Sequence, residues 1–362
     1  MSSEITMVPD PHLMESLRAV GYTLTTAVAD VIDNSITAGS TRVEIRAGSE
    51  PEDYLAVIDN GTGMTAEQAQ HAMRLAGTSP ASTRSSTDLG RFGLGLKTAS
   101  LSQCRRLTVV SRRHGVLCGY EWDLDHLQRT QSWSLIQLEE KECVGLPGFE
   151  LLKKHESGTL VLWRNLDILQ STHGDFDTGL NRALVELREH LALVFHRFLA
   201  GEHGQPLQIA LNARPVEGAD PLMPTHKATQ VGPAEQIAVD GGSVVLQAFT
   251  LPHLNKLTQK QRQLAQVSGS LRDSQGFYIY REKRLVIWGT WFRIMPKQEL
   301  GKLARVRVDI PNTLDHLWSL DIKKAQAAPP TIIRERLKSV SEKMIAPSRR
   351  VAEYRGRVMP TG

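Results

Sequence analysis

Apolar residues recur at helix-like or strand-like spacing along most of the chain. From residue 11 to residue 37 they fall three or four positions apart, which predicts a helix that Gly21 interrupts and Gly39 ends. Further helices are expected at 65–76, 95–103 and 178–199. Short apolar runs predict strands at 42–46, 54–58, 107–112, 116–122 and 159–163. The first half of the chain therefore mixes helices with strands.

After Gly201 the pattern changes, and strand-like runs dominate. These runs predict strands at 207–211, 243–249, 276–280, 285–288 and 303–309. Helical spacing is confined to 256–265 and 296–302. The step Ala327-Ala328-Pro329-Pro330 ends this region. We therefore predict a first domain over residues 1–200, a second over 201–328 and a basic helical tail over 329–362.

Composition places the chain among ordinary globular proteins. Its 362 residues suit two domains, and 41% are hydrophobic and 23% charged. No apolar run approaches the roughly 18 residues that a membrane-spanning helix needs. The cysteines, Cys104, Cys118 and Cys143, are odd in number and not at metal-ligand spacing, so neither a disulfide framework nor a zinc site is expected. These features favour a cytoplasmic protein without a membrane partner.

Charge is concentrated at the C-terminal end. The net charge is +4, but residues 331–362 hold eight Lys and Arg against three Glu, which gives +5 and leaves −1 for residues 1–330. A basic tail can bind nucleic acid or an acidic protein surface, although such runs are often only solvated helix faces.

The first group of candidate residues lies at Asp30-Val31-Ile32-Asp33-Asn34. Asp30 and Asn34 are four positions apart, so they share one face of the predicted helix. An amide oxygen can ligate Mg²⁺, and a carboxylate can accept a proton from an attacking water. Asp33 is a second candidate base, but it projects about 100° away around the helix. Taken alone, this pattern is also that of a helix showing polar residues to solvent.

The second group, Asp59-Asn60-Gly61-Thr62-Gly63-Met64, follows the predicted strand 54–58 directly. Glycines let the backbone approach a ligand closely, and Gly63 leaves room for a base edge. The carboxylate of Asp59 can accept a hydrogen from the exocyclic amino group of adenine, whereas the carbonyl oxygen of guanine would repel it. Asn-Gly and Asp-Gly dipeptides are also common in turns, so this motif is a weak signal by itself.

The third group is Gly90-Arg91-Phe92-Gly93-Leu94-Gly95-Leu96-Lys97-Thr98, which opens the predicted helix 95–103. Backbone N–H groups at a helix N-terminus bind anions, and Lys97 adds positive charge. The spacing matches neither the Walker pattern nor the dinucleotide-binding fingerprint. The stretch from Gly77-Thr78-Ser79 to Asp88 would form a lid over a nucleotide, or else an ordinary surface loop.

In this order the three groups resemble the GHKL superfamily, which includes gyrase B, MutL, MORC proteins and histidine kinases. The resemblance covers about residues 10 to 165. It implies an α+β fold, in which a two-layer α/β sandwich (the Bergerat ATP-binding fold) carries helices on one face of a mixed sheet. It also implies ATP and Mg²⁺ as cofactors, with Asn34 on the metal. Thr159, in Ser157-Gly158-Thr159, matches a late-strand threonine near the adenine.

The residues that the resemblance assigns to the nucleotide come from the helix, the three loops and the late strand. They are Asn34, Asp59, Gly61, Gly63, Met64, Thr78, Gly90, Arg91, Phe92, Gly93, Leu94, Gly95, Leu96, Lys97 and Thr159. One departure concerns the base, because hydrolysing relatives usually carry Glu where this chain has Asp30. Aspartate is one methylene shorter, a loss of roughly 1.5 Å in reach. Slow hydrolysis is therefore expected.

The second half resembles the ribosomal-protein-like α/β transducer domain of MutL-like and MORC-like proteins. The match rests on 276–286, Asp309-Ile310-Pro311 and Leu320-Asp321-Ile322-Lys323-Lys324. In those relatives a transducer lysine reaches the terminal phosphate, a catalytic role that Lys323 or Lys324 would fill; a solvent-exposed lysine pair is an equal alternative. The motif Gly-Leu-Lys-Thr-Ala-Ser favours prokaryotic MORC-like proteins over MutL.

These observations predict a Mg²⁺-dependent ATPase that acts as a conformational switch. The resemblance implies an ATP-dependent homodimer acting on DNA or on a DNA-processing partner, in a setting such as defence or restriction. Two alternatives stay open. One is a nucleotide-dependent binding module that does not hydrolyse ATP, and the other is a protein kinase with the same fold.

Overall fold

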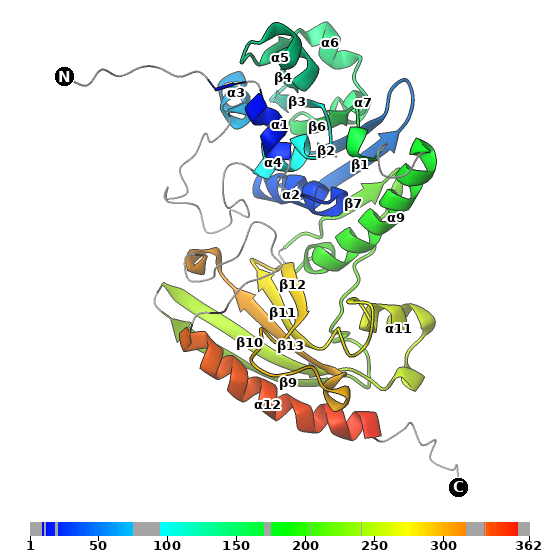
Figure 1. Cartoon of the computed structure of the whole chain (residues 1–362), viewed down its shortest axis with the longest axis vertical. Helices are drawn as coiled ribbons and strands as arrows, with labels where there is room; N and C mark the ends of the chain where they lie inside the picture. Colours follow the sequence, from blue (N-terminus) through cyan, green and yellow to red (C-terminus); the bar gives the residue numbers. More distant parts are fainter. Residues whose placement is uncertain are drawn as a thin grey trace, which may run out of the picture. The chain divides into compact units, whose positions relative to one another are not determined.

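The computed structural model describes residues 9–10, 12–18, 21–74, 95–169, 175–202, 204–239, 241–315, 329 and 331–353. The chain forms two compact units (Figure 1). The first comprises Met1–Leu191 and Gly204–Val216, and the second comprises Ala192–His203 and Glu217–Gly362. The chain thus leaves the first unit, returns to it briefly, and leaves again.

An eight-stranded sheet forms the centre of the first unit. Its order is β5-β4-β3-β6-β2-β1-β7-β8, antiparallel except where β1 runs parallel to β7. The strands are β1 (Arg42–Gly48), β2 (Tyr54–Asp59), β3 (Arg106–Arg113), β4 (Val116–Asp123), β5 (Ile136–Leu138), β6 (Gly158–Arg164), β7 (Gln208–Leu211) and β8 (Arg214–Pro215). The predicted boundary at residue 200 assigned 207–211 to the second domain. That assignment is wrong, because the backbone of β7 completes this sheet beside β1.

Helices pack on both faces of this sheet. They are α1 (His12–Arg18), α2 (Leu24–Thr37), α3 (Ala66–Met73), α4 (Gly95–Leu101), α5 (Leu124–Thr130), α6 (Glu140–Val144), α7 (Phe149–Leu152) and α9 (Phe176–Val194). On one face α2 packs against β2 and α4, and α3 packs against β3 and β4. On the other, Cys143, Phe149 and Leu152 from the short α6 and α7 pack on Ile58 and Leu160. The two-layer expectation therefore omitted a small second covering.

The second unit has a five-stranded sheet of order β12-β11-β13-β10-β9, with β11 parallel to β13. The strands are β9 (Gln230–Val239), β10 (Gly242–Thr250), β11 (Gly276–Arg281), β12 (Arg284–Thr290) and β13 (Ala304–Ile310). The strand β9 escaped prediction because it contains Gly232 and Pro233 and lies at the sheet edge, where proline is tolerated. Other elements are α10 (His196–Leu199), α11 (Gln259–Ala265), α12 (Thr331–Glu353) and the 3₁₀ turns η1 (Leu254–Lys256), η2 (Glu299–Gly301) and η3 (Asn312–Leu314).

The basic C-terminal helix is part of the second unit's core. Ile333, Leu337 and Val340 of α12 are buried against the sheet, along which the helix lies in Figure 1. A separate tail over 329–362 is therefore the wrong description of residues 331–353. Arg334 and Lys338 remain exposed on the outer side of α12.

Three predicted helices differ from the observed ones. The expected helix 11–37 appears as α1 and α2, because Gly21 has φ of 77° and Thr23 caps α2 by accepting the N–H of Thr26. The expected helix 178–199 is divided at Phe195, whose backbone leaves helical geometry. The expected helix 296–302 shortens to η2. No described helix is long and apolar enough to cross a membrane.

Candidate functional site

Asp59 lies at the C-terminal end of β2, beneath α2. Its side chain is almost fully buried, with 6% of its surface exposed. Ser35 Oγ on α2 donates to Asp59 Oδ2 at 2.9 Å, and the Gly61 N–H donates to Oδ1 at 2.8 Å. Burial raises the pKa of the Asp59 carboxyl, and hydrogen bonds from Gly61, Ser35, Ser40 and the Thr159 backbone oppose that rise.

The loop after Asp59 requires its two glycines. A Cβ on Gly61 would lie 2.8 Å from the Cβ of Ala38. Gly63 has φ of 63°, and a Cβ there would lie 2.1 Å from the carbonyl oxygen of Arg112. The N–H of Thr62 donates to the Ala38 carbonyl at 3.0 Å, which ties the loop to the end of α2. Glycine is therefore needed here for close packing of backbone against backbone.

Four polar residues lie in one row across four neighbouring strands. Asp59 on β2 pairs with Thr159 on β6, Thr159 with Ser111 on β3, and Ser111 with Cys118 on β4. Directly paired residues of antiparallel strands place their side chains on the same face. The row therefore lies on the face that also carries Ser35 and α3. Asp59 and Thr159 of this row were among the predicted site residues, but Ser111 and Cys118 were not, since nothing local in the sequence marks their register.

The backbone of Met64 is bound to this row. Its N–H donates to Ser111 Oγ at 2.8 Å, and its carbonyl oxygen accepts from Cys118 Sγ at 3.9 Å. Ser111 Oγ also contacts the Gly158 carbonyl at 3.2 Å and Thr159 Oγ1 at 3.4 Å. The glycine loop and the late strand are thus joined through one buried hydroxyl.

The helix α2 presents its polar residues on different sides, as expected. Asn34 is exposed and Asp30 is half-buried, whereas Asp33 is buried with 5% of its surface exposed. The exposed amide of Asn34 and the carboxylate one turn before it fit an oxygen-ligated Mg²⁺ held mainly by phosphates. Among the described residues no cluster of three His, Cys, Asp or Glu side chains could hold a metal by itself.

Lys97 occupies a buried position on α4, with 3% of its surface exposed. Its Nζ donates to the carbonyl oxygens of Ala72 at 2.9 Å and Arg74 at 2.6 Å. Trp122 Nε1 donates to the carbonyl between them, that of Met73, at 2.9 Å. Burial lowers the pKa of Lys97 to about 8. The lysine thus caps the carbonyl end of α3, a contact that the sequence did not predict.

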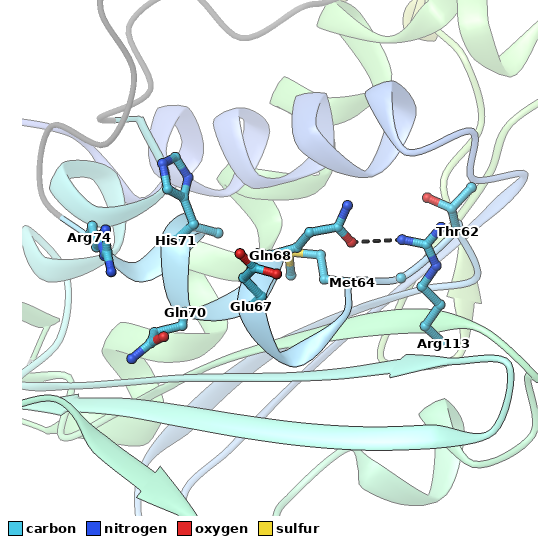
Figure 2. Close-up of a pocket in the computed structure, with 10 residues that line it drawn as sticks. Thr62, Met64, Glu67, Gln68, Gln70, His71, Arg74 and Arg113 are labelled. Atoms are coloured by element: carbon cyan, nitrogen blue, oxygen red, sulfur yellow. Dashed lines mark hydrogen bonds between the residues drawn. The ribbon is translucent and has the colours of Figure 1, made fainter.

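A cavity of about 700 Å³ runs along α3, as Figure 2 shows. It has the size of small-molecule sites. Arg113 Nη1 donates to Gln68 Oε1 at 2.7 Å within it. Gly63 and Met64 line one end, so the cavity reaches the loop expected to line a base. Other residues along it include Glu67, His71 and Arg74.

Several predicted site residues lie outside the described residues. They are Thr78, Gly90, Arg91, Phe92, Gly93, Leu94, Lys323 and Lys324. The backbone of Gly95 begins α4, and Leu96 follows it as a half-buried side chain. The structure thus brings together Asp59, Gly61, Gly63, Met64 and Thr159.

Comparison with known proteins gives the same picture for the first unit. Residues 22–159 match the family described as histidine kinase-, DNA gyrase B-, and HSP90-like ATPase. Over 96 residues the chain is 34% identical to the DNA mismatch repair protein MutL of Rhizobium leguminosarum bv. trifolii, covering 26% of this chain and 16% of that protein. Over 92 residues it is 32% identical to ATPase morc-1 of Caenorhabditis elegans, covering 25% of this chain and 10% of that protein.

A shorter match reaches higher identity. Over 43 residues the chain is 49% identical to the mismatch repair endonuclease pms1 of Dictyostelium discoideum, covering 12% of this chain and 4% of that protein. The matches span at most 16% of the length of these three relatives. A domain of the matched family implies ATP binding. Residues 22–159 therefore form a domain of the GHKL type, similar to domains of MutL and of a MORC ATPase.

Proposed function

We propose that the first unit binds ATP with its adenine against Asp59. The observation that carries this proposal is the buried carboxylate at the end of β2, fixed by Ser35 and Gly61 and set beside Thr159. A buried carboxylate acceptor favours an amino group and disfavours a carbonyl oxygen. Gly61 and Gly63 keep the adjoining backbone close, and Met64 borders the neighbouring cavity.

The second part of the proposal is ATP hydrolysis with Mg²⁺. Asn34 would contribute its amide oxygen to the metal, and Asp30 would accept a proton from the attacking water. When bound, Mg²⁺ neutralises charge on the phosphates. The phosphates would lie towards the N-terminus of α4, with Gly90, Gly93 and Gly95 around them and Lys97 behind.

The third part concerns what ATP controls. ATP would join two copies of the chain, and hydrolysis would release them, with Lys323 or Lys324 of a transducer-like second unit sensing the terminal phosphate. The names of the relatives, a mismatch repair protein among them, support DNA or a DNA-processing protein as the partner. The exposed Arg334 and Lys338 on α12 offer positive charge for such a partner. A defence role rests on resemblance to MORC-like proteins alone.

One observation favours a different function. Asp30 stands where hydrolysing relatives usually carry Glu, and its shorter reach suits a nucleotide-dependent binding module that does not turn ATP over. Transfer of phosphate to a protein would instead indicate a kinase.

The test is ATP binding and phosphate release by the purified chain, each measured with and without duplex DNA. We expect Mg²⁺-dependent binding and slow phosphate release. Binding without release would favour the binding module. Absence of ATP binding, or binding unaffected by Asp59→Asn, would overturn the proposal.

A further inference from the structure

The buried hydroxyl of Ser111 lies between the glycine loop and the strand that carries Thr159. Ser111 is fully buried, with 0% of its surface exposed. Among the residues that the structure describes, its Oγ has three neighbours within hydrogen-bonding distance: the N–H of Met64, the carbonyl oxygen of Gly158 and the hydroxyl of Thr159. Because Ser111 is fully buried, we take the hydrogens of these groups to be shared among themselves.

The capacity of a serine hydroxyl fixes how they are shared. A hydroxyl donates one hydrogen and accepts two. The Met64 N–H can only donate, so it takes one acceptor position on Ser111. The Gly158 carbonyl can only accept, so it takes the Ser111 hydrogen. The remaining acceptor position then faces Thr159, across a contact of 3.4 Å in which either hydroxyl could donate. With the Ser111 hydrogen directed at Gly158, the donor in this contact is Thr159.

This assignment decides what Thr159 presents to a ligand. With its hydrogen directed at Ser111, the Thr159 oxygen offers only lone pairs to a ligand on this face of the sheet. Asp59, directly paired with Thr159 across the sheet, presents carboxylate lone pairs on the same face. The polar edge formed by these two residues therefore accepts hydrogens and donates none from its side chains. An amino group complements such an edge, and a carbonyl oxygen is repelled by it.

We propose that Ser111 is a positioning residue for base selectivity, which holds the Thr159 hydroxyl as an acceptor and so favours a 6-amino purine over a 6-oxo purine. This inference rests on the proposed function, because it requires that the row from Asp59 to Cys118 faces the adenine of ATP. Without Ser111, the Thr159 hydroxyl is free to turn and donate to a 6-oxo group. Asp59 still disfavours that group, so selectivity falls without vanishing.

The test compares dissociation constants for ATP and inosine triphosphate, which differ only in replacing the 6-amino group and N1 by a carbonyl and N1–H. We expect Ser111→Ala to narrow the preference for ATP about tenfold, equivalent to roughly 1.4 kcal/mol. Ser111→Thr, which keeps a hydroxyl, should restore most of it. In a Thr159→Val background, Ser111→Ala should leave the preference unchanged, because the hydroxyl it controls is gone.

A matched control is Thr108→Val, which removes another fully buried hydroxyl of β3. Thr108 lies on the opposite face, where it donates to Glu121. The Thr108→Val substitution should lower the stability of the fold without changing the preference for ATP over inosine triphosphate. If Ser111→Ala does not fold, Thr159→Val provides the test instead. It should narrow the preference for ATP over inosine triphosphate.

Two outcomes overturn the inference. One is Ser111→Ala weakening both nucleotides equally, which is what mere support of the loop would produce. The other is Thr159→Val leaving the preference at its wild-type value. A wild-type chain that binds no ATP would instead refute the proposed function, so the two failures are distinguishable.

Discussion

The Ser35 hydroxyl donates to Asp59 Oδ2 at 2.9 Å and so joins helix α2 to the end of strand β2. The bond links the element expected to hold Mg²⁺ with the element expected to hold the base. It also stabilises a carboxylate in a place where burial opposes its charge.

Replacing Asp59 should separate binding from stability. Asp59→Asn removes the charged acceptor, so we expect ATP affinity to fall roughly 30- to 100-fold, as for a lost hydrogen bond to a charged group. Because burial raises the pKa of Asp59, ionising this group is less favourable in the folded chain than in the unfolded chain. The amide removes this cost of burying a charge but turns its NH₂ group towards Ser35 or Gly61, so we expect only a small change in the melting temperature. Calorimetric titration measures the ATP affinity, and thermal unfolding measures the melting temperature. An Asp59→Asn variant that binds ATP normally would contradict the assignment of Asp59 to the adenine.

ATP binding should weaken as pH falls. Protonation of Asp59 removes its acceptor, and its raised pKa means that the loss begins at higher pH than for an exposed aspartate. Ser35→Ala removes a hydrogen bond to the ionised form, so the midpoint should move to still higher pH. In the nucleotide-free protein, the same raised pKa means that Asp59's contribution to stability decreases as pH rises past its unfolded pKa. Dissociation constants across the acidic range test this, and a midpoint that Ser35→Ala moves downward would argue against it.

Binding of ATP should take up a proton near pH 8.5. The pKa of Lys97 is lowered to about 8, so much of it is neutral there, and nearby phosphate charge would raise that pKa. The binding enthalpy should therefore depend on the ionisation enthalpy of the buffer. Lys97→Arg, which stays protonated, should abolish this dependence. Identical enthalpies in two different buffers for the wild-type chain would place Lys97 away from the phosphates.

The length of the side chain at position 30, the proposed proton acceptor, should control the rate of ATP hydrolysis. Asp30→Asn should retain ATP binding and abolish phosphate release, while Asp30→Glu should raise the rate because it restores reach. Asp33→Asn serves as the comparison, since Asp33 is buried on another side of the helix. Unchanged release by Asp30→Asn would move the role of base to another residue.

Replacing Gly63 in the loop after β2 should lower both the stability of the fold and the affinity for ATP. Gly63→Ala combines a left-handed φ, costing about 1–2 kcal/mol, with a contact of 2.1 Å to the Arg112 carbonyl oxygen. Gly115→Ala is the matched control, because Gly115 has φ of 80° but nothing within 4 Å of an added Cβ. Chemical denaturation should show the larger loss for Gly63→Ala, and only that variant should lose ATP affinity. If the two variants lost equal stability, the positive φ alone would explain why glycine is needed at position 63.

The sequence by itself determined the local elements and the ordered motifs. Helical spacing located α2, and the dipeptides around Gly61 and Gly63 located the loop after β2. The resemblance to the GHKL superfamily rested on this order of motifs.

Tertiary structure decided the pairing between distant segments. The return of β7 to the first sheet depends on backbone hydrogen bonds beside β1, which no local pattern reveals. The row from Asp59 to Cys118 depends on register across four strands, where a shift of one residue would turn each side chain to the other face. The contacts of Lys97 with the end of α3 likewise arise only when two helices meet. Local propensity acts over a few residues, whereas these contacts join positions from about twenty to more than one hundred and fifty residues apart, so only the folded chain specifies them.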